Sequence, residues 1–471
     1  MHRLAYVILV SYLLAGYGVA TSKEIKPIDL SCRNCNIIFL DIDLLRSDFG
    51  SVSFPGNKNT PNINTFFKNS IFFTDVMASS GVTAISNTST LTGMDGHFTY
   101  SLLKNTFVDK PPQMPDRYLK MYMTTPTIAE TLHKNGYQTI NVNHGWYAGK
   151  QMLLNRGFDT YWGTGEANSV DRGPGSSIEK TASFLKQKSR DNKKFFLLLR
   201  SEDLRGVPYR YPINRSRIQD QRISYKKVDK SFVEVRYQIG ENGKIKGGYS
   251  SFQMAGWMTD SQIAEYQALA KEIYSNQLSF VDEKLGKVFK ALNETNLVNN
   301  SIIVLYSNHG DGLYDNKVPN HGVSYQSCVS VPVLIKHPKV DRFIAIKPTV
   351  ALKDLVPTIY EMISLSQPTG MDGISLAPLI NGQPPPSEFF YGVDKESQYI
   401  RYKNMKLIVW ADRNKELYDL NLDPQEKRNI ATENPDLVYE LDEKLSEHDI
   451  IGLSKAFDLI DSFHLDRVPH D

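Results

Sequence analysis

The chain has 471 residues, of which 41% are hydrophobic and 23% charged, a balance that excludes an intrinsically disordered protein. Its 54 lysines and arginines nearly match its 52 aspartates and glutamates, so no strong charge points to nucleic acid or an anionic membrane as a partner. Three cysteines exclude a disulfide-built scaffold. The length predicts one large domain with an appendage, or two to three smaller domains.

A short apolar run opens the chain over residues 4–20, after His2 and Arg3 and before a polar stretch. This pattern predicts a secretory signal over residues 1–22, removed when the protein is exported to the periplasm or secreted. An uncleaved anchor is the alternative. No later run is apolar enough to cross a bilayer, so we expect no transmembrane span after signal removal.

Two cysteines, Cys32 and Cys35, lie just before the first predicted strand. In an exported chain we expect this pair to form a small disulfide loop. A thioredoxin-like redox role would need the pair on a strand-to-helix turn, and here it precedes a strand. Cys328 would then be unpaired and buried.

Apolar runs alternate with helix patterns along the next 300 or so residues. The predicted strands cover residues 36–42, 71–73, 137–142, 195–200 and 302–306. The predicted helices cover residues 63–69, 127–135 and 265–292. This alternation predicts an α/β fold with a mostly parallel sheet and helices on both faces.

Two further stretches have a different character. Residues 213–247 are basic and polar, which indicates a surface insertion. A proline-rich linker at residues 383–386 is followed by a hairpin pattern at 399–410 and a helix pattern at 437–448. We therefore predict a main domain over residues 33–380 and a small C-terminal α+β subdomain over residues 387–460.

Polar side chains follow the predicted strands, at the sheet edge where open α/β proteins bind ligands. Asp41 and Asp43 share one side of the first strand, and Asp43 at its tip could hold a hard cation or simply cap a loop. Asn308 and His309 follow the 302–306 strand, and His321 lies farther along. Together they indicate a cation or phosphate-like group, although a single histidine is more often structural.

A Ser-Gly turn at residues 80–81 runs into a helix pattern that begins near Thr83. A helix N-terminus favours an anion and lowers the pKa of a hydroxyl. Asn87 lies one turn farther on the same face. The alternative is that Thr83 merely caps the helix.

Read in order, these segments resemble the sulfatases of the alkaline phosphatase superfamily. The blocks that carry the resemblance include NIIFLDIDLLRSD at 36–48, TPNINTFFKNSIFFTDVMASS at 60–80, TLTG at 90–93, SNHGDG at 307–312 and ELYDLNLDPQEKRNI at 416–430. The resemblance implies an alkaline phosphatase-like fold with Thr83 at the nucleophile position. It also implies one divalent cation (Ca, Mg, Mn or Zn), and its ligands would be Asp43, Asn308 and His309.

The chain departs from the family at the chemistry. Thr83 cannot become formylglycine, which is made from Cys or Ser, so none is expected. The position of the signature Arg holds Asn87, that of the second opening Asp holds Leu44, and that of the metal-binding Asp of the second motif holds Asn308. Related phosphoethanolamine and glycerol-phosphate transferases do use a Thr nucleophile beside one metal, and they carry a histidine in a context like His321-Gly322.

The leading hypothesis is a metal-assisted hydrolase or transferase that acts on sulfate or phosphate esters of a small molecule or glycan. Thr83 would attack, and His321 and His144, the latter near the family's Gly-Lys-Trp-His block, would stabilise the reacting group. Asn87 would contact substrate, and so would Arg205, which stands about where another substrate histidine of the family usually lies. The alternative is a catalytically inactive protein that binds sulfated or phosphorylated glycans.

Overall fold

The structure is a computed structural model. It describes residues 27–48, 58–97, 126–143, 154–163, 175–188, 193–206, 260–318, 320–394 and 396–462. The predicted signal at residues 1–22, His144 and the predicted insertion at 213–247 lie outside the described residues. Within these ranges, no helix is both long and apolar enough to cross a membrane.

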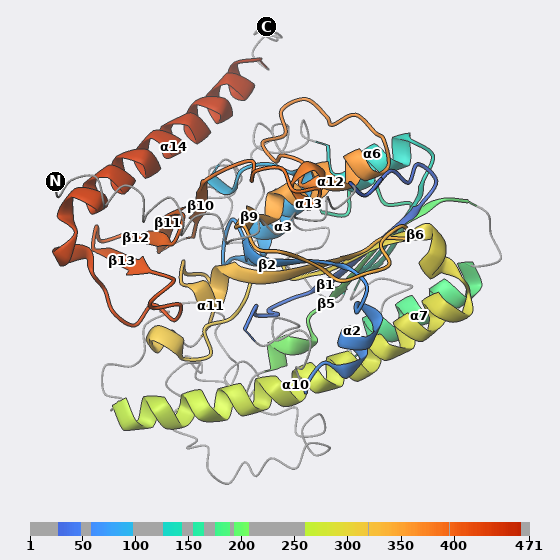
Figure 1. Ribbon diagram of the computed structural model, residues 1–471, viewed down its shortest axis with the longest axis horizontal. Helices are drawn as coiled ribbons and strands as arrows, with labels where there is room; N and C mark the ends of the chain where they lie inside the picture. The colour runs from blue at the N-terminus through green and yellow to red at the C-terminus, as the bar shows by residue number, and fades with distance from the viewer. Residues whose placement is uncertain are drawn as a thin grey trace, which may run out of the picture.

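A nine-stranded sheet forms the centre of the protein, in the order β4-β3-β5-β1-β6-β7-β2-β8, with β9 also paired to β2 (Figure 1). Strands β4, β3, β5, β1 and β6 are parallel neighbours, whereas β7 is antiparallel to β6 and β2. The predicted mixed, mostly parallel sheet is confirmed. The strands are β1 (Asn36–Ile42), β2 (Ile71–Met77), β3 (Gln138–Asn143), β4 (Thr160–Gly163), β5 (Phe195–Ser201), β6 (Ser301–Tyr306), β7 (Ser330–Lys336), β8 (Ile344–Ile346) and β9 (Val350–Ala351).

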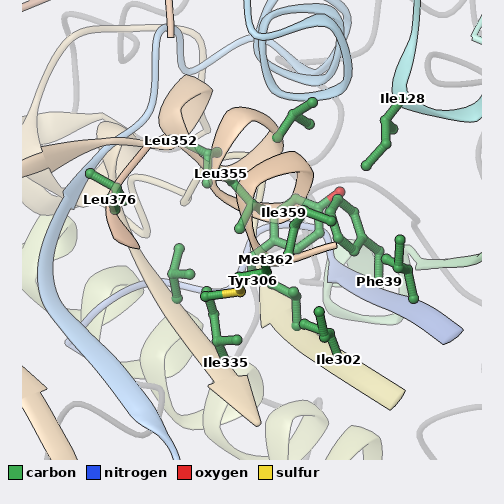
Figure 2. Close-up of a cluster of buried hydrophobic side chains, with 14 of the residues drawn as sticks. Phe39, Ile128, Ile302, Tyr306, Ile335, Leu352, Leu355, Ile359, Met362 and Leu376 are labelled. Carbon is green, nitrogen blue, oxygen red and sulfur yellow. The ribbon is translucent and has the colours of Figure 1, made fainter. Parts of the chain in front are cut away.

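Helices cover both faces of this sheet (Figure 1). One layer contains α2 (Pro61–Phe66), α7 (Ser176–Lys188) and α10 (Asp260–Glu294), and the other contains α3 (Thr83–Thr92), α6 (Ile128–Lys134), α12 (Leu355–Met362) and α13 (Ala377–Ile380). Alternate residues of β1 face the two layers, so that Phe39 joins one core cluster and Leu40 the other. Figure 2 shows the first cluster, where Phe39 and Tyr306 lie against Ile359. Burial on both faces explains why these strands are almost wholly apolar.

A second, antiparallel sheet follows in the order β10-β11-β12-β13. Its strands are β10 (Phe389–Val393), β11 (Ser397–Tyr402), β12 (Met405–Trp410) and β13 (Lys415–Asp419). The predicted hairpin is β11-β12. Helix α14 (Pro435–Ser462) packs on β11 and β12 through buried Leu441 and Leu445. It continues past the predicted end at residue 448 to Ser462.

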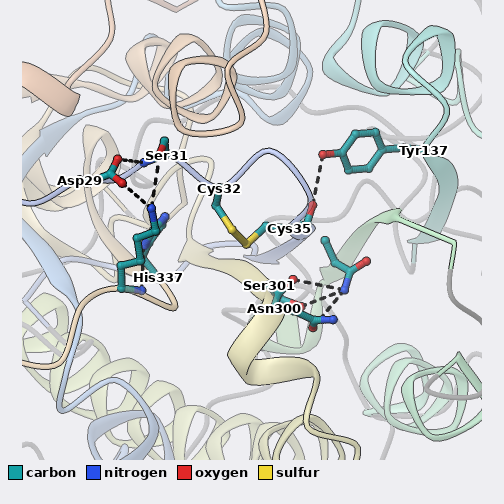
Figure 3. The surroundings of a disulfide bond; sticks show 10 residues. Asp29, Ser31, Cys32, Cys35, Tyr137, Asn300, Ser301 and His337 are labelled. Atoms are coloured by element: carbon teal, nitrogen blue, oxygen red, sulfur yellow. Dashed lines mark hydrogen bonds and ion pairs between the residues drawn. A yellow bond between two sulfur atoms is a disulfide. The ribbon is translucent and has the colours of Figure 1, made fainter.

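The predicted loop closed by Cys32 and Cys35 is confirmed, with their Cα atoms 5.4 Å apart (Figure 3). The Cys32 N–H donates to the Met362 carbonyl at 2.5 Å, and the Tyr137 hydroxyl donates to the Cys35 carbonyl at 3.2 Å. Cys328, also as predicted, is unpaired and buried. The loop thus ties the start of β1 to α12 and β3.

Candidate functional site

The carboxyl ends of β1 and β5 bring two carboxylates against one guanidinium. The parallel register sets Asp41 beside Arg200, whose Nη1 donates to Asp41 Oδ2 at 2.5 Å. Arg200 Nη2 lies 3.0 Å from Oδ1 of Asp43, the first residue beyond β1. All three side chains are buried. Burial raises the pKa of Asp41 to about 6 despite the nearby Arg200.

A second guanidinium reaches Asp43 from the 3₁₀ turn Asp203–Gly206, which follows β5. Arg205 Nε donates to Asp43 Oδ2, and Arg205 Nη2 donates to the hydroxyl oxygen of Thr83. Burial alone would raise the pKa of Asp43, but Arg200 and Arg205 hold it below its usual range. Arg205 therefore bridges a fixed carboxylate and the Thr83 hydroxyl.

Thr83 is the first residue of α3, whose N-cap is Val82. Its Oγ1 lies 2.9 Å from His309 Nε2. His309 Nδ1 lies 2.8 Å from the Gly310 carbonyl, and a carbonyl can only accept, so Nδ1 carries the proton. Nε2 is then an acceptor for the Thr83 hydroxyl. Burial lowers the pKa of His309 to about 4, which keeps the ring neutral at pH 7.

Two asparagines occupy different surroundings at this site. The Asn87 amide donates to the Thr83 carbonyl at 3.0 Å, within its own helix. The Asn308 side chain is fully buried, and neither its oxygen nor its nitrogen bonds to any residue that the structure describes. A buried amide without partners is costly and marks a place where a ligand would bind.

His321 lies beside this group, with its ring centre 4.6 Å from that of His309. Its Nδ1 is 3.1 Å from Asp311 Oδ1. The turn before α3 packs closely on the His321 loop, since a Cβ on Gly81 would lie 2.9 Å from the Val323 carbonyl. The structure thus brings together Asp43, Thr83, Arg205, Asn308, His309 and His321, and Asn87 lies on the same helix as Thr83.

Sequence reasoning missed Arg200. Its signal was available, because a single arginine ends the otherwise apolar run of 195–200 and so lies at the carboxyl edge of the sheet. The alternation of the strand predicts that Asp41 and Asp43 share one side, but it does not predict that Arg200 pairs with Asp41. Only the β1–β5 register shows that Arg200 joins the two carboxylates.

As they lie, the residues predicted to bind a metal do not fit a divalent cation. Asp43 is the only carboxylate among them, and both its oxygens face guanidinium nitrogens. Leu44, next in sequence, is buried in the core with φ of 68°. Two unit charges 4 Å apart interact by about 4 kcal/mol at an effective dielectric constant of 20, and a divalent ion would roughly double that repulsion from each arginine. The metal role of Asp43, Asn308 and His309 therefore rests on the sequence alone.

A second group of possible metal ligands lies where α14 meets the end of α3. Ligand atoms of Asp95, His97 and His448 lie within 4.8 Å of one another. The Lys353 ammonium is 2.7 Å from Asp95 Oδ2, so this carboxylate already has a cation. The distances would allow Asp95, His97 and His448 to hold a metal ion. Their present contacts instead join the end of α3 to α14, and we call these three residues the polar clamp.

The family follows from a comparison with known proteins. A family model described as Sulfatase matches residues 36–364. The chain belongs to the sulfatase family. A second model, described as N-sulphoglucosamine sulphohydrolase, C-terminal, matches residues 311–450. Sulfatases generally use a divalent metal ion, whereas both oxygens of Asp43 here contact guanidinium groups.

The chain spans about two fifths of the length of the curated relatives that it matches. Mouse Arylsulfatase K is 30% identical over 216 residues, which are 42% of this chain and 38% of the mouse protein. The phosphonate monoester hydrolase of Agrobacterium radiobacter has a TM-score of 0.63 at 16% identity, covering 89% of this chain and 96% of that one. A structure solved with its substrate D-glucosamine-2-N,6-O-disulfate has a TM-score of 0.62 at 19% identity, covering 89% and 98%. The structural neighbours show the same fold.

Proposed function

We propose that this protein is a sulfatase-family hydrolase in which the Thr83 hydroxyl attacks the sulfur of a sulfate ester or the phosphorus of a phosphate ester. One observation carries the proposal. The Thr83 oxygen lies 2.9 Å from Nε2 of a neutral His309 and also accepts from Arg205. A base on the proton and a cation on the oxygen are the two requirements for activating a hydroxyl.

In the first half of the reaction, His309 Nε2 takes the Thr83 proton as the bond from Thr83 oxygen to sulfur forms. The ester bond breaks on the opposite side, and the leaving oxygen takes a proton from an imidazolium. His321 and His144, which were predicted to stabilise the reacting group, would donate this proton, and His144 lies outside the described residues. Arg205 and the buried Asn308 amide would donate to the non-bridging oxygens.

In the second half, water attacks the sulfur and gives its proton to the imidazole that supplied the leaving group. The Thr83 oxygen departs and recovers its proton from His309, which restores the starting state. A hydroxyl acceptor in place of water would make the same site a transferase. In this proposal Asn87 and Arg205 would contact the substrate, as the sequence predicts.

The proposed substrate class rests on similarity to known proteins, and the proposed place of action rests on the predicted export. A relative bears the name arylsulfatase, and one structural neighbour was solved with a sulfated glucosamine. We therefore propose a small-molecule or glycan ester as substrate and the periplasm or the outside of the cell as the place of action. The predicted division into a domain over 33–380 and a subdomain over 387–460 belongs to the same proposal.

Turnover of aryl sulfate and aryl phosphate esters by the purified protein tests this function. Thr83→Ala should lower turnover by roughly 10³-fold or more, whereas Thr83→Ser, which keeps a hydroxyl, should retain it. Thr90→Ala is the matched control, because Thr90 is buried on the same helix and bonds the Ser86 carbonyl. Mass spectrometry of quenched reactions should find a sulfo or phospho group on the peptide that contains Thr83.

No turnover of either ester class, with equal binding of a sulfated glycan by the wild type and Thr83→Ala, would reject catalysis. The alternative of a glycan-binding protein without activity would then hold.

A further inference from the structure

Arg205 makes the two contacts that an activating cation must make. A metal ion that activates a hydroxyl touches an anionic ligand on one side and the hydroxyl oxygen on the other. Arg205 Nε donates to Asp43, and Arg205 Nη2 donates to Thr83. We propose that the Arg205 guanidinium takes the place of the family's divalent cation, so that this site binds a sulfate or phosphate group without metal. The inference deepens the proposed function at the same site.

The surroundings of Arg205 favour a permanent organic cation. Asp43 is completely buried and receives Arg205 on Oδ2 and Arg200 on Oδ1. Glu202 is the third carboxylate at the two arginines, after Asp41 and Asp43. Its Oε1 lies 3.5 Å from Arg205 Nε and 3.6 Å from Arg200 Nη2. A guanidinium remains charged at every accessible pH, and its planar fork suits both carboxylate and sulfate oxygens.

The substitutions at the site are balanced in charge. Compared with the family pattern, Leu44 and Asn308 each remove one negative charge, and Asn87 removes one positive charge. Arg205 adds one positive charge about where a histidine usually lies. Loss of a divalent cation would remove two, so all these changes together leave the net charge of the site unchanged. The departures that look like separate defects are thus one consistent exchange of a metal for an arginine.

The chemistry of the exchange concerns binding and charge. When Thr83 attacks, Arg205 Nη2 would move its donation from the hydroxyl to a non-bridging oxygen of the sulfur or phosphorus group. The buried Asn308 amide, which has no partner among the described residues, would donate to a second such oxygen. No redox change or additional reactant is required, since the guanidinium keeps its protons throughout.

The first test measures binding rather than turnover. Purified wild type should contain no stoichiometric divalent metal by elemental analysis. Its melting temperature should be the same with EDTA and with added Ca²⁺, Mg²⁺, Mn²⁺ or Zn²⁺. In EDTA, inorganic sulfate and phosphate should raise the melting temperature. A stoichiometric cation whose removal abolishes the anion effect would overturn the inference.

Variants of Arg205 give the second test. Arg205→Ala should abolish the shift caused by sulfate in EDTA, and Arg205→Lys should restore part of it, since a lysine keeps the charge without the fork. Arg428→Ala, at an exposed arginine far along the chain, is the control and should bind sulfate as the wild type does. An unchanged sulfate effect in Arg205→Ala would contradict the proposal.

Restoring the family's carboxylates and removing Arg205 should restore cation binding. The triple variant Leu44→Asp, Asn308→Asp, Arg205→Ala should gain a melting-temperature shift with divalent cations. If the triple variant does not fold, the double variant Asn308→Asp, Arg205→Ala provides the same readout. No gain of cation binding in a folded variant would count against the exchange. A wild type that binds sulfate in EDTA without turning over any ester would reject the proposed hydrolase and leave this inference standing.

Discussion

Asp394, at the end of β10, reaches from the small sheet to both loops of the candidate site. Its Oδ1 accepts from the Ser80 hydroxyl at 2.5 Å and from the Gly81 N–H at 2.8 Å, just before Thr83. Its Oδ2 accepts from the Ser324 hydroxyl at 3.1 Å, just after the His321 loop. The Asp394 carboxylate, which touches no reacting group itself, therefore fixes the spacing between the turn before Thr83 and the His321 loop.

Burial raises the pKa of Asp394 to about 6, against about 3.9 in an unfolded chain. The folded protein therefore binds the proton of the Asp394 carboxyl more tightly than the unfolded chain does. The stability that this proton contributes is complete below about pH 4 and is lost as pH rises to about 6. Two pK units correspond to about 3 kcal/mol. Asp394→Asn should keep the two hydrogen bonds to Oδ1, reverse the one with Ser324 so that the amide donates, and remove this dependence.

Urea unfolding of wild type and Asp394→Asn between pH 4 and 8 checks this prediction. The stability of the wild type relative to the variant should fall between pH 4 and 6 and stay level above. Asp394→Ala, which leaves Ser80 and Gly81 without their acceptor, should be less stable at every pH. Parallel profiles for wild type and Asp394→Asn would show that Asp394 does not carry the titration.

Helix α14 meets the end of α3 at the polar clamp of Asp95, His97 and His448. His448 Nε2 lies 3.0 Å from Asp95 Oδ1, and its ring stacks on Tyr391 at 3.7 Å between ring centres. His97 Nε2 lies 3.1 Å from Asp449 Oδ1. Farther toward its start, α14 is held by apolar contacts of Leu441 and Leu445 with the small sheet. The helix thus has an apolar attachment and a polar one.

Truncation of the polar attachment should loosen α14 without releasing it. His448→Ala removes the Asp95 contact and the Tyr391 stacking, so we expect a loss of about 1–2 kcal/mol. Amide exchange should accelerate after residue 445 and stay slow around Leu441. Ile450→Ala is the control, since Ile450 is 65% exposed on the same helix. Equal exchange in the two variants would show that the clamp does not hold the helix.

At the scale of the whole molecule, buried strands were the most predictable part. The runs that became β1, β5 and β6 are mostly apolar because both faces of the sheet are covered. β4 escaped prediction because its residues Thr160–Gly163 are only partly buried and its pattern is short. Burial does not explain every missed strand, since the apolar β7 is buried and was not predicted either.

The candidate site was predictable in most of its members, Arg200 excepted, and not in its contacts. Asp43, Thr83, Asn308 and His309 end strands or begin a helix, which the sequence indicates directly. The pairing of Asp41 with Arg200 depends on strand register between residues 159 positions apart, which local pattern does not encode. Arg205 was predicted to touch substrate, and its contacts with Asp43 and Thr83 became visible only once the turn after β5 was placed.

The N-terminal segment connects distant parts of the chain, and its disulfide should stabilise that connection. The Ile28 N–H donates to Asn381 Oδ1 at 2.7 Å, just after α13, and Lys339 Nζ donates to Asp29 Oδ2 at 2.6 Å, in the loop after β7. The Cys32–Cys35 bond closes a very short loop, for which chain entropy predicts about 2 kcal/mol.

Replacement of Cys32 and Cys35 by serine should therefore lower the melting temperature by a few degrees, with ester turnover unchanged, because neither cysteine touches the candidate site. Cys328→Ser alone is the control for loss of a thiol, although that thiol is buried and its own packing cost must be measured beside the pair. Calorimetry of the variants, with and without reductant, makes the comparison. Reductant should destabilise the wild type and leave the double variant unaffected. A wild type indifferent to reductant, with both thiols open to labelling, would mean that the loop is not closed and that the hydrogen bonds alone hold the segment.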